Sequence, residues 1–185
     1  MITLVVGTNR QGSRTRHIAT HVEEIYRELG VQLAVADLAT LPAEIFNPSS
    51  YDEAPESFRP FQEAITAAHG LVIVTPEYNG GIPGILKYFI DMLEFPVSFE
   101  RRPVCFVGLA KGMWGALRPV EQLQQIYAYR NGYIYPERVF LPHVDQLLGG
   151  DGRLKDAGLV ERLRKQAAGY VDFVERIKGV KLRAI

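Results

Sequence analysis

Residues 71–90 pass from an apolar run through an irregular loop into a helical pattern, reading LVIVTPEYNGGIPGILKYFI. Leu71–Val74 is continuously apolar and mostly β-branched, which is typical of a strand buried on both faces of a parallel sheet. Pro83 suits the start of a helix whose inner face would carry Leu86 and Phe89. The stretch therefore predicts one strand-loop-helix unit of an α/β fold.

The same unit repeats on both sides of this stretch. Strands are predicted at 2–6, 31–36, 71–74, 104–109 and 133–141, the last interrupted by Pro136. Helices are predicted at 13–29, from Ser57 to Gly70, from Pro83 onward, at 119–129 and at 156–177. Strands that alternate with helices require parallel crossovers, so we expect a single domain with a doubly wound, five-stranded parallel sheet and helices on both faces.

Local signals refine the boundaries of these elements. Ser13 is a candidate N-cap of the first helix and Gly30 its stop, while Ser57 is a candidate N-cap of the second. Residues 41–56 contain three prolines among polar residues, which indicates a long loop with a function of its own or a cover over a site.

Composition excludes several classes of protein. Among 185 residues, 21 Lys and Arg balance 21 Asp and Glu, so we expect no nucleic-acid partner. The single cysteine, Cys105, excludes an intrachain disulfide and a cysteine-based metal site. His17 and His21 share a helical spacing, but no third ligand accompanies them, and we predict no metal.

The sequence also bears on location. No apolar run approaches the roughly 18 residues that a membrane span needs. The chain opens directly into an apolar strand with no basic leader before it. We therefore expect a cytoplasmic protein without a membrane partner.

The loop after the first predicted strand, residues 7–15, reads GTNRQGSRT. It leads into a helix N-terminus, where unpaired backbone N–H groups and the positive end of the helix dipole favour an anion. Hydroxyl, amide and guanidinium groups of the loop add further donors. We interpret the loop as a phosphate site, the alternative being a polar turn before a capped helix.

The pattern of this loop also limits the kind of phosphate. Gly7 and Gly12 have the spacing of a Walker A loop, but Ser13 and Arg14 stand where its Lys and Ser/Thr belong. The dinucleotide fingerprint G-x-G-x-x-G is absent as well. The loop therefore suits a monophosphate held without a metal ion.

The loop after the third predicted strand, residues 75–84, contains two prolines and three glycines. Such a loop lets backbone N–H groups approach a flat ligand closely, because glycine offers no side-chain obstruction. Tyr78 adds an aromatic face, and Glu77 and Asn79 add polar groups. The alternative is a tight turn whose tyrosine packs on the next helix. Because a phosphate loop follows the neighbouring strand, we favour the interpretation of residues 75–84 as a site for a ring system.

These motifs resemble those of the NADPH-dependent FMN reductase family. The resemblance rests on 7–13, on 75–80, and on Leu-Lys at 86–87 followed by Ile-Asp at 90–91. It implies a flavodoxin-like fold with strand order 2-1-3-4-5. It implies an FMN phosphate held by Thr8, Asn9, Arg10, Gly12, Ser13, Arg14 and Thr15. It implies a flavin ring lying along Pro76, Glu77, Tyr78, Asn79 and Gly80.

The family's third flavin loop corresponds to residues 110–116, AKGMWGA. Gly112 and Gly115 fit the family pattern, whereas Ala110 replaces a serine and Ala116 replaces the second of two paired glycines. Gly112 and Trp114 are the candidate flavin contacts here. Trp114 has two readings: it stacks near the flavin rim, or it is a core or subunit-contact residue.

The resemblance implies an oxidoreductase in which NADPH passes a hydride to bound FMN. A small-molecule acceptor then takes the electrons, with free flavin, quinones, azo compounds and metal oxyanions as candidates. No acid–base side chain is obligatory, so we predict no catalytic residue. The family also implies a homodimer or homotetramer. The alternatives are a flavodoxin-type electron carrier, disfavoured by the neutral charge, and a flavodoxin-like binding protein that has lost its flavin.

Overall fold

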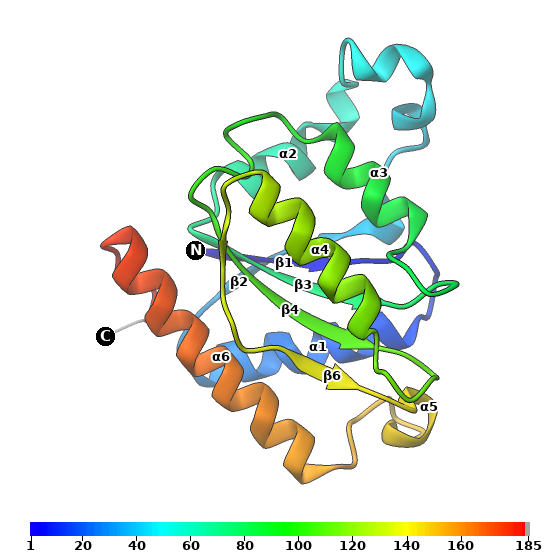
Figure 1. Cartoon of the computed structure of the whole chain (residues 1–185), viewed down its shortest axis with the longest axis vertical. Coiled ribbons are helices and arrows are strands. Elements are labelled where there is room, and N and C mark those ends of the chain that lie inside the picture. The colour runs from blue at the N-terminus through cyan, green and yellow to red at the C-terminus, as the bar shows by residue number, and fades with distance from the viewer. Residues whose placement is uncertain (184–185) are drawn as a thin grey trace.

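The computed structural model describes residues 1–183 and contains a parallel sheet with helices on both faces (Figure 1). The strands are β1 (Ile2–Val6), β2 (Leu33–Asp37), β3 (Gly70–Pro76), β4 (Pro103–Leu109), β5 (Tyr133–Ile134) and β6 (Val139–Leu141). Their order is β2-β1-β3-β4-β5, and β6 also pairs with β4. All of these pairs are parallel. The predicted doubly wound sheet with order 2-1-3-4-5 is confirmed.

Two helical layers cover the sheet. The longer helices are α1 (Arg14–Glu28), α2 (Arg59–Thr66), α3 (Gly84–Met92), α4 (Leu117–Tyr129) and α6 (Ala157–Lys178), and α5 (Val144–Leu147) is a single turn. Successive residues of β4 pack on opposite faces of the sheet. Cys105 packs with α1 and α6 on one face, and Phe106 packs with α2, α3 and α4 on the other. Within residues 1–183, none of the helices has the length and apolar character needed to cross a membrane.

The fifth predicted strand is two strands in the structure. β5 pairs with the start of β4 at Pro103 and Val104, and β6 pairs with its end from Val107 to Leu109. Pro136 lies between them and has no N–H to donate to a ladder, which explains why pairing stops there. The expected five-stranded sheet is therefore six-stranded, with β5 and β6 sharing one edge of β4.

The boundaries of α1 match the sequence signals. The Oγ of Ser13 accepts a hydrogen bond from the N–H of Arg16 at 3.2 Å, as an N-cap should. Gly30 follows the helix with φ +74°, a conformation that favours glycine. The Nε2 of His21, a partly buried residue of α1, accepts a hydrogen bond from the N–H of Leu154 at 3.0 Å, which attaches the loop before α6 to this helix.

The predicted N-cap at Ser57 is wrong. Ser57 lies inside a 3-10 turn, η4 (Glu56–Phe58), and α2 begins only at Arg59. Phe58 occupies the cap position without a side-chain hydrogen bond, while Pro60 in the first turn supplies the helix-start signal. The proline signal, rather than a hydroxyl cap, therefore sets the start of α2.

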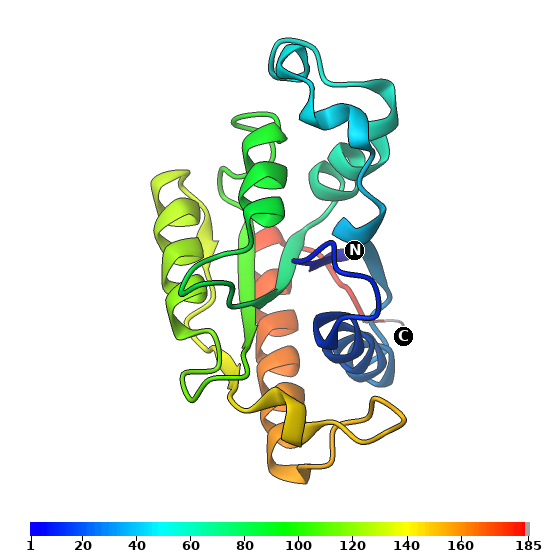
Figure 2. The same cartoon turned by 90° about the vertical axis from the view of Figure 1, so that its right-hand side faces the viewer.

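The predicted loop at 41–56 is a chain of 3-10 turns that follows η1 (Leu38–Thr40), namely η2 (Ala43–Phe46) and η3 (Pro48–Tyr51). This cyan segment projects beyond the layers in both views (Figures 1 and 2). The hydroxyl of Tyr88 on α3 donates to the carbonyl of Ile45 at 2.6 Å, which anchors the segment. None of its residues lines the cavity described below.

Cys105 lies in the middle of β4 with no exposed surface, as predicted for an inert thiol. Burial raises the pKa of this thiol, so the reactive thiolate is suppressed. We expect a disulfide-exchange reagent at pH 8 to modify the native protein roughly 1000-fold more slowly than the urea-unfolded chain, because modification requires unfolding of the core. Absorbance of the released thiol measures both rates. Rapid native-state modification would show that β4 opens locally.

Candidate functional site

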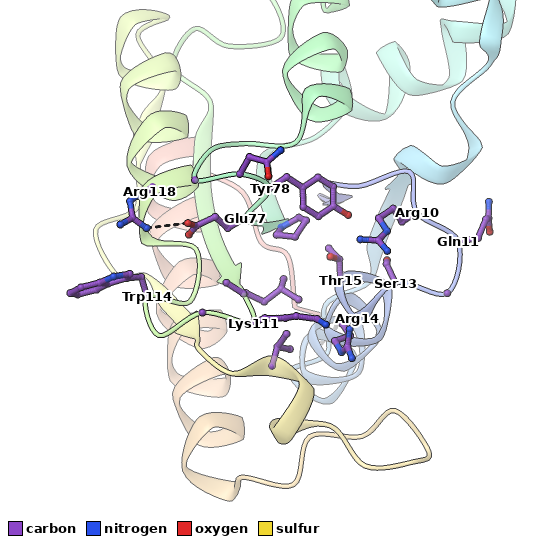
Figure 3. A pocket seen from close by; sticks show the side chains of 18 residues that line it. Arg10, Gln11, Ser13, Arg14, Thr15, Glu77, Tyr78, Lys111, Trp114 and Arg118 are labelled. Atoms are coloured by element: carbon purple, nitrogen blue, oxygen red, sulfur yellow. Dashed lines mark hydrogen bonds and ion pairs between the residues drawn. The ribbon is translucent and has the colours of Figure 1, made fainter.

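A cavity of about 490 Å³ opens at the carboxyl ends of β1, β3 and β4 (Figure 3). Three loops form its wall: 7–13 after β1, 77–83 after β3 and 110–116 after β4. The carboxyl ends of parallel strands are where ligands of doubly wound sheets bind. Every residue predicted to bind the cofactor lines this cavity except Thr8 and Asn9. The cavity wall also contains Gln11, Leu109, Ala110, Lys111, Arg118 and Val144.

The first loop presents its backbone to the cavity. Gly12 adopts φ +62°, in the region that favours glycine, and a Cβ at this position would contact nothing within 4 Å. Ser13 caps α1, so the first-turn N–H groups of a 15-residue helix face the same end of the cavity. Arg10 and Arg14 add guanidinium groups to the wall. This donor set fits a phosphomonoester.

The second loop is a small hairpin. The N–H of Tyr78 donates to the carbonyl of Gly81, and the N–H of Gly81 donates back to Tyr78, each at 3.0 Å. Asn79 and Gly80 between them have φ values of +51° and +78°. Positive φ at both central residues defines a type I′ turn, for which Asn-Gly is the preferred pair. The turn therefore explains why the sequence carries Asn and Gly at these positions.

Tyr78 and Thr8 join the first two loops. Their hydroxyl oxygens lie 2.7 Å apart, and the N–H of Arg10 donates to the Thr8 Oγ1 at 3.3 Å. The Arg10 guanidinium lies 5.9 Å from the centre of the Tyr78 ring. Thr8 is buried, whereas Asn9 is exposed. Thr8 therefore lies outside the cavity wall and is joined to it through Tyr78, and Asn9 is not part of the wall either.

Glu77 and Arg118 form an ion pair in the wall of the cavity. Arg118 Nη1 donates to Glu77 Oε1 at 3.1 Å (Figure 3). The other carboxylate oxygen, Oε2, is buried and has no hydrogen-bond partner among residues 1–183. A buried acceptor without a partner is costly, so this atom suits an N–H or O–H donor of a bound molecule. Sequence reasoning missed Arg118, because nothing in the pattern of α4 distinguishes it from a solvated arginine.

Hydrogen bonds to neighbouring segments hold the third loop in place. The N–H of Ala110 donates to Leu141 at 3.1 Å, and the N–H of Val144 donates to Ala110 at 3.0 Å. Trp114 lies at the rim with 52% of its surface exposed, and its indole is turned outward in Figure 3. The core reading of Trp114 is therefore wrong, and its two remaining readings are a rim residue and a subunit contact.

Ala116, at the start of α4, adopts φ +72° although it is not a glycine. A non-glycine residue in this region costs about 1 kcal/mol or more. Ala116 is also fully buried, so Ala116→Gly removes a buried methyl group worth about 0.8 kcal/mol. We expect the strain relieved to offset this loss and the greater chain entropy of glycine, so that the free energy of unfolding changes by less than about 1 kcal/mol. Urea unfolding followed by circular dichroism measures this change, and a loss of about 2 kcal/mol would contradict the strain argument.

Comparison with known proteins identifies the family. The model of the NADPH-dependent FMN reductase family matches residues 1–146. An NAD(P)H-dependent FMN reductase of Pseudomonas aeruginosa is 27% identical over 154 residues, 81% of this chain and 82% of the relative. A quinone reductase of Escherichia coli is 27% identical over 186 residues, 96% of each chain.

A solved structure supports the same fold. The flavoenzyme FerB of Paracoccus denitrificans, an NAD(P)H:(acceptor) oxidoreductase, superimposes with a TM-score of 0.77 at 22% identity, covering 95% of this chain and 97% of its own. A flavodoxin of Streptococcus pneumoniae superimposes with a TM-score of 0.61 at 14% identity, covering 93% of this chain and 97% of its own, so the flavodoxin-like architecture implied by the sequence motifs is confirmed. Because the family model spans most of the sequence, the chain belongs to the NADPH-dependent FMN reductase family.

Proposed function

We propose that this chain binds FMN in the cavity and uses NAD(P)H to reduce a small-molecule acceptor. As a member of its family, it is an oxidoreductase that uses FMN and a nicotinamide cofactor. The observation that carries the proposal is the meeting of the phosphate-type loop at 7–15 with the hydrogen-bonded hairpin Tyr78–Gly81 in one cavity. The acceptor classes are those named from the sequence: free flavin, quinones, azo compounds or metal oxyanions.

Different residues of the cavity would hold the phosphate and the ring of FMN. Gly12, Ser13 and Thr15 would hold the phosphate with Arg10 and Arg14, because backbone, hydroxyl and guanidinium donors meet there. The flavin ring would lie along Pro76–Gly80 and Gly112. Glycine and the narrow turn leave room there for a flat group. Thr8 would act through Tyr78, whose ring it holds by a hydrogen bond.

FMN held here would supply the hydride chemistry between the nicotinamide and the acceptor. The chain positions the reacting groups. The Tyr78–Gly81 hairpin fixes one wall, and Gln122 Oε1 accepts from the N–H of Ile82 at 3.0 Å to hold that hairpin against α4. Placement contributes strongly to such a transfer, because the reacting atoms must meet within about 3–3.5 Å. The side chains of this site orient and bind, and none is assigned a proton transfer.

Two finer features belong to the same proposal. We propose a homodimer or homotetramer, supported by the exposed Trp114 on the third loop and the exposed Phe95 and Tyr129 near the far end of α4. Sedimentation velocity measures the assembly, and a monomer at micromolar concentration would contradict it. A cytoplasmic location is supported by the NAD(P)H that the reaction consumes.

A flavin titration tests the proposal directly. Addition of FMN to the purified protein should quench flavin fluorescence with an end point at one equivalent per chain. NADPH or NADH should then bleach the bound flavin, and steady-state rates with a quinone should give the parallel lines of a ping-pong mechanism. Absence of FMN binding at micromolar concentration would overturn the proposal in favour of a flavin-free binding protein. Bleaching without turnover of any small acceptor would favour an electron carrier.

A further inference from the structure

Two cations from different loops share one carboxylate beside the phosphate end of the cavity. Lys111 Nζ of the third loop lies 3.3 Å from Asp145 Oδ2, and Arg14 Nη2 at the start of α1 lies 3.7 Å from the same oxygen. Lys111 and Arg14 both line the cavity. Figure 3 shows the Lys111 side chain extending from the third loop toward Arg14. The third loop thus delivers a positive charge to the loop that binds phosphate.

Backbone hydrogen bonds fix the position of the loop that carries Lys111. The N–H of Val144 donates to Ala110 at 3.0 Å, and the N–H of His143 donates to Gly112 at 3.4 Å. These bonds attach the start of α5 to the residues on either side of Lys111. Asp145, the next residue of α5, is therefore attached to the third loop, and its carboxylate holds the lysine ammonium near Arg14 of α1.

The local charge favours an anionic ligand. Burial raises the pKa of Asp145, but its own backbone N–H, Lys111 and Arg14 outweigh that effect and leave the pKa below its ordinary value. Asp145 is therefore ionised at neutral pH, and the cluster keeps one net positive charge. Because Lys111 and Arg14 can approach one carboxylate oxygen together, they can also approach one phosphate oxygen together.

We propose that Lys111 is a further ligand of the flavin phosphate and makes the site prefer FMN to riboflavin. The inference rests on the proposed function. Lys111 is the cation that the third loop contributes to the cavity wall, and its ammonium shares the Asp145 carboxylate with Arg14 at the start of α1. The phosphate monoester carries between one and two negative charges at pH 7, and riboflavin carries none.

Titrations with two flavins test this role. For Lys111→Met, we expect the FMN dissociation constant to rise about tenfold, the loss of one charge-assisted contact, while that for riboflavin changes less than about twofold. Lys111→Arg should restore most of the FMN affinity. Lys165→Met is the matched control, because Lys165 is an exposed lysine of α6 outside the cavity wall. Thermal unfolding of each variant verifies the fold.

The outcomes separate this inference from the proposed function. Wild-type protein that binds neither flavin overturns the proposed function. Wild-type protein that binds FMN, with Lys111→Met and Lys165→Met equal to it, overturns the role of Lys111 alone. Equal loss of FMN and riboflavin affinity in Lys111→Met also overturns it, since the lysine would then support the loop or the ring rather than the phosphate. Weaker dependence of FMN affinity on salt in Lys111→Met is the supporting result.

Discussion

Ser13→Asp is expected to weaken FMN binding by at least about 100-fold while leaving the fold as stable as before. Aspartate is as good an N-cap as serine, so the bond from Arg16 and the start of α1 should survive. The new carboxylate, however, would stand beside the phosphate. Two like charges about 4 Å apart near a protein surface repel by roughly 4 kcal/mol, which is more than a 100-fold loss requires.

Ser13→Asn is the matched control, because asparagine has the shape of aspartate and caps helices without a charge. We expect it to lose less than about tenfold in FMN affinity. Fluorescence titration with FMN and riboflavin, beside thermal unfolding, separates repulsion from misfolding. If Ser13→Asp bound FMN as tightly as the wild type, the phosphate would lie elsewhere, and the assignment of residues 7–15 would be wrong.

Gly115→Ala should be the most destabilising small substitution in the third loop. Gly115 has φ +56°, and a Cβ there would lie 2.9 Å from the backbone nitrogen of Pro142 and 3.0 Å from that of Leu141. Backbone atoms of a strand end cannot move aside as a flexible side chain can. Conformational strain and this overlap together should lower the free energy of unfolding by about 3 kcal/mol.

Gly112→Ala is the internal comparison for stability. Gly112 belongs to the same loop, has no positive φ, and has open space where a Cβ would stand. Its free energy of unfolding should change by less than about 0.5 kcal/mol. Urea unfolding of both variants, without flavin, measures the contrast. Equal effects at the two positions would mean that the contact between Gly115 and the segment after β6 is absent in solution.

Much of the fold could be predicted because the chain's local signals agree with its packing. The apolar runs at 2–6, 71–74 and 104–109 became central strands, since burial on both faces leaves little room for polar residues. Prediction failed at the sheet edge, where Pro136 splits β5 from β6. The short helix α5 was missed because four residues carry no periodicity.

The candidate site was predictable where chemistry and backbone geometry share one segment, as at Gly12–Ser13 and Asn79–Gly80. It was not predictable where distant segments meet. Arg118 belongs to the cavity wall as the ion-pair partner of Glu77, which lies 41 residues earlier in the sequence; its Nη1 is 3.1 Å from Glu77 Oε1. Thr8 was predicted as a cofactor ligand; it lies outside the cavity wall and contacts Tyr78, so its part in binding stays a prediction. Such roles depend on tertiary contacts that no local pattern encodes.

The closed turn at Asn79–Gly80 also bears on how fast a ligand binds. Its two reciprocal hydrogen bonds and the bond from Ile82 to Gln122 join groups of this chain to one another. Because the chain's own contacts fix this wall, we expect no rearrangement of it before contact. Association with flavin should then follow a single exponential whose rate rises linearly with flavin concentration in stopped flow. Discrimination between flavins would accordingly be expressed in residence time rather than in the rate of capture.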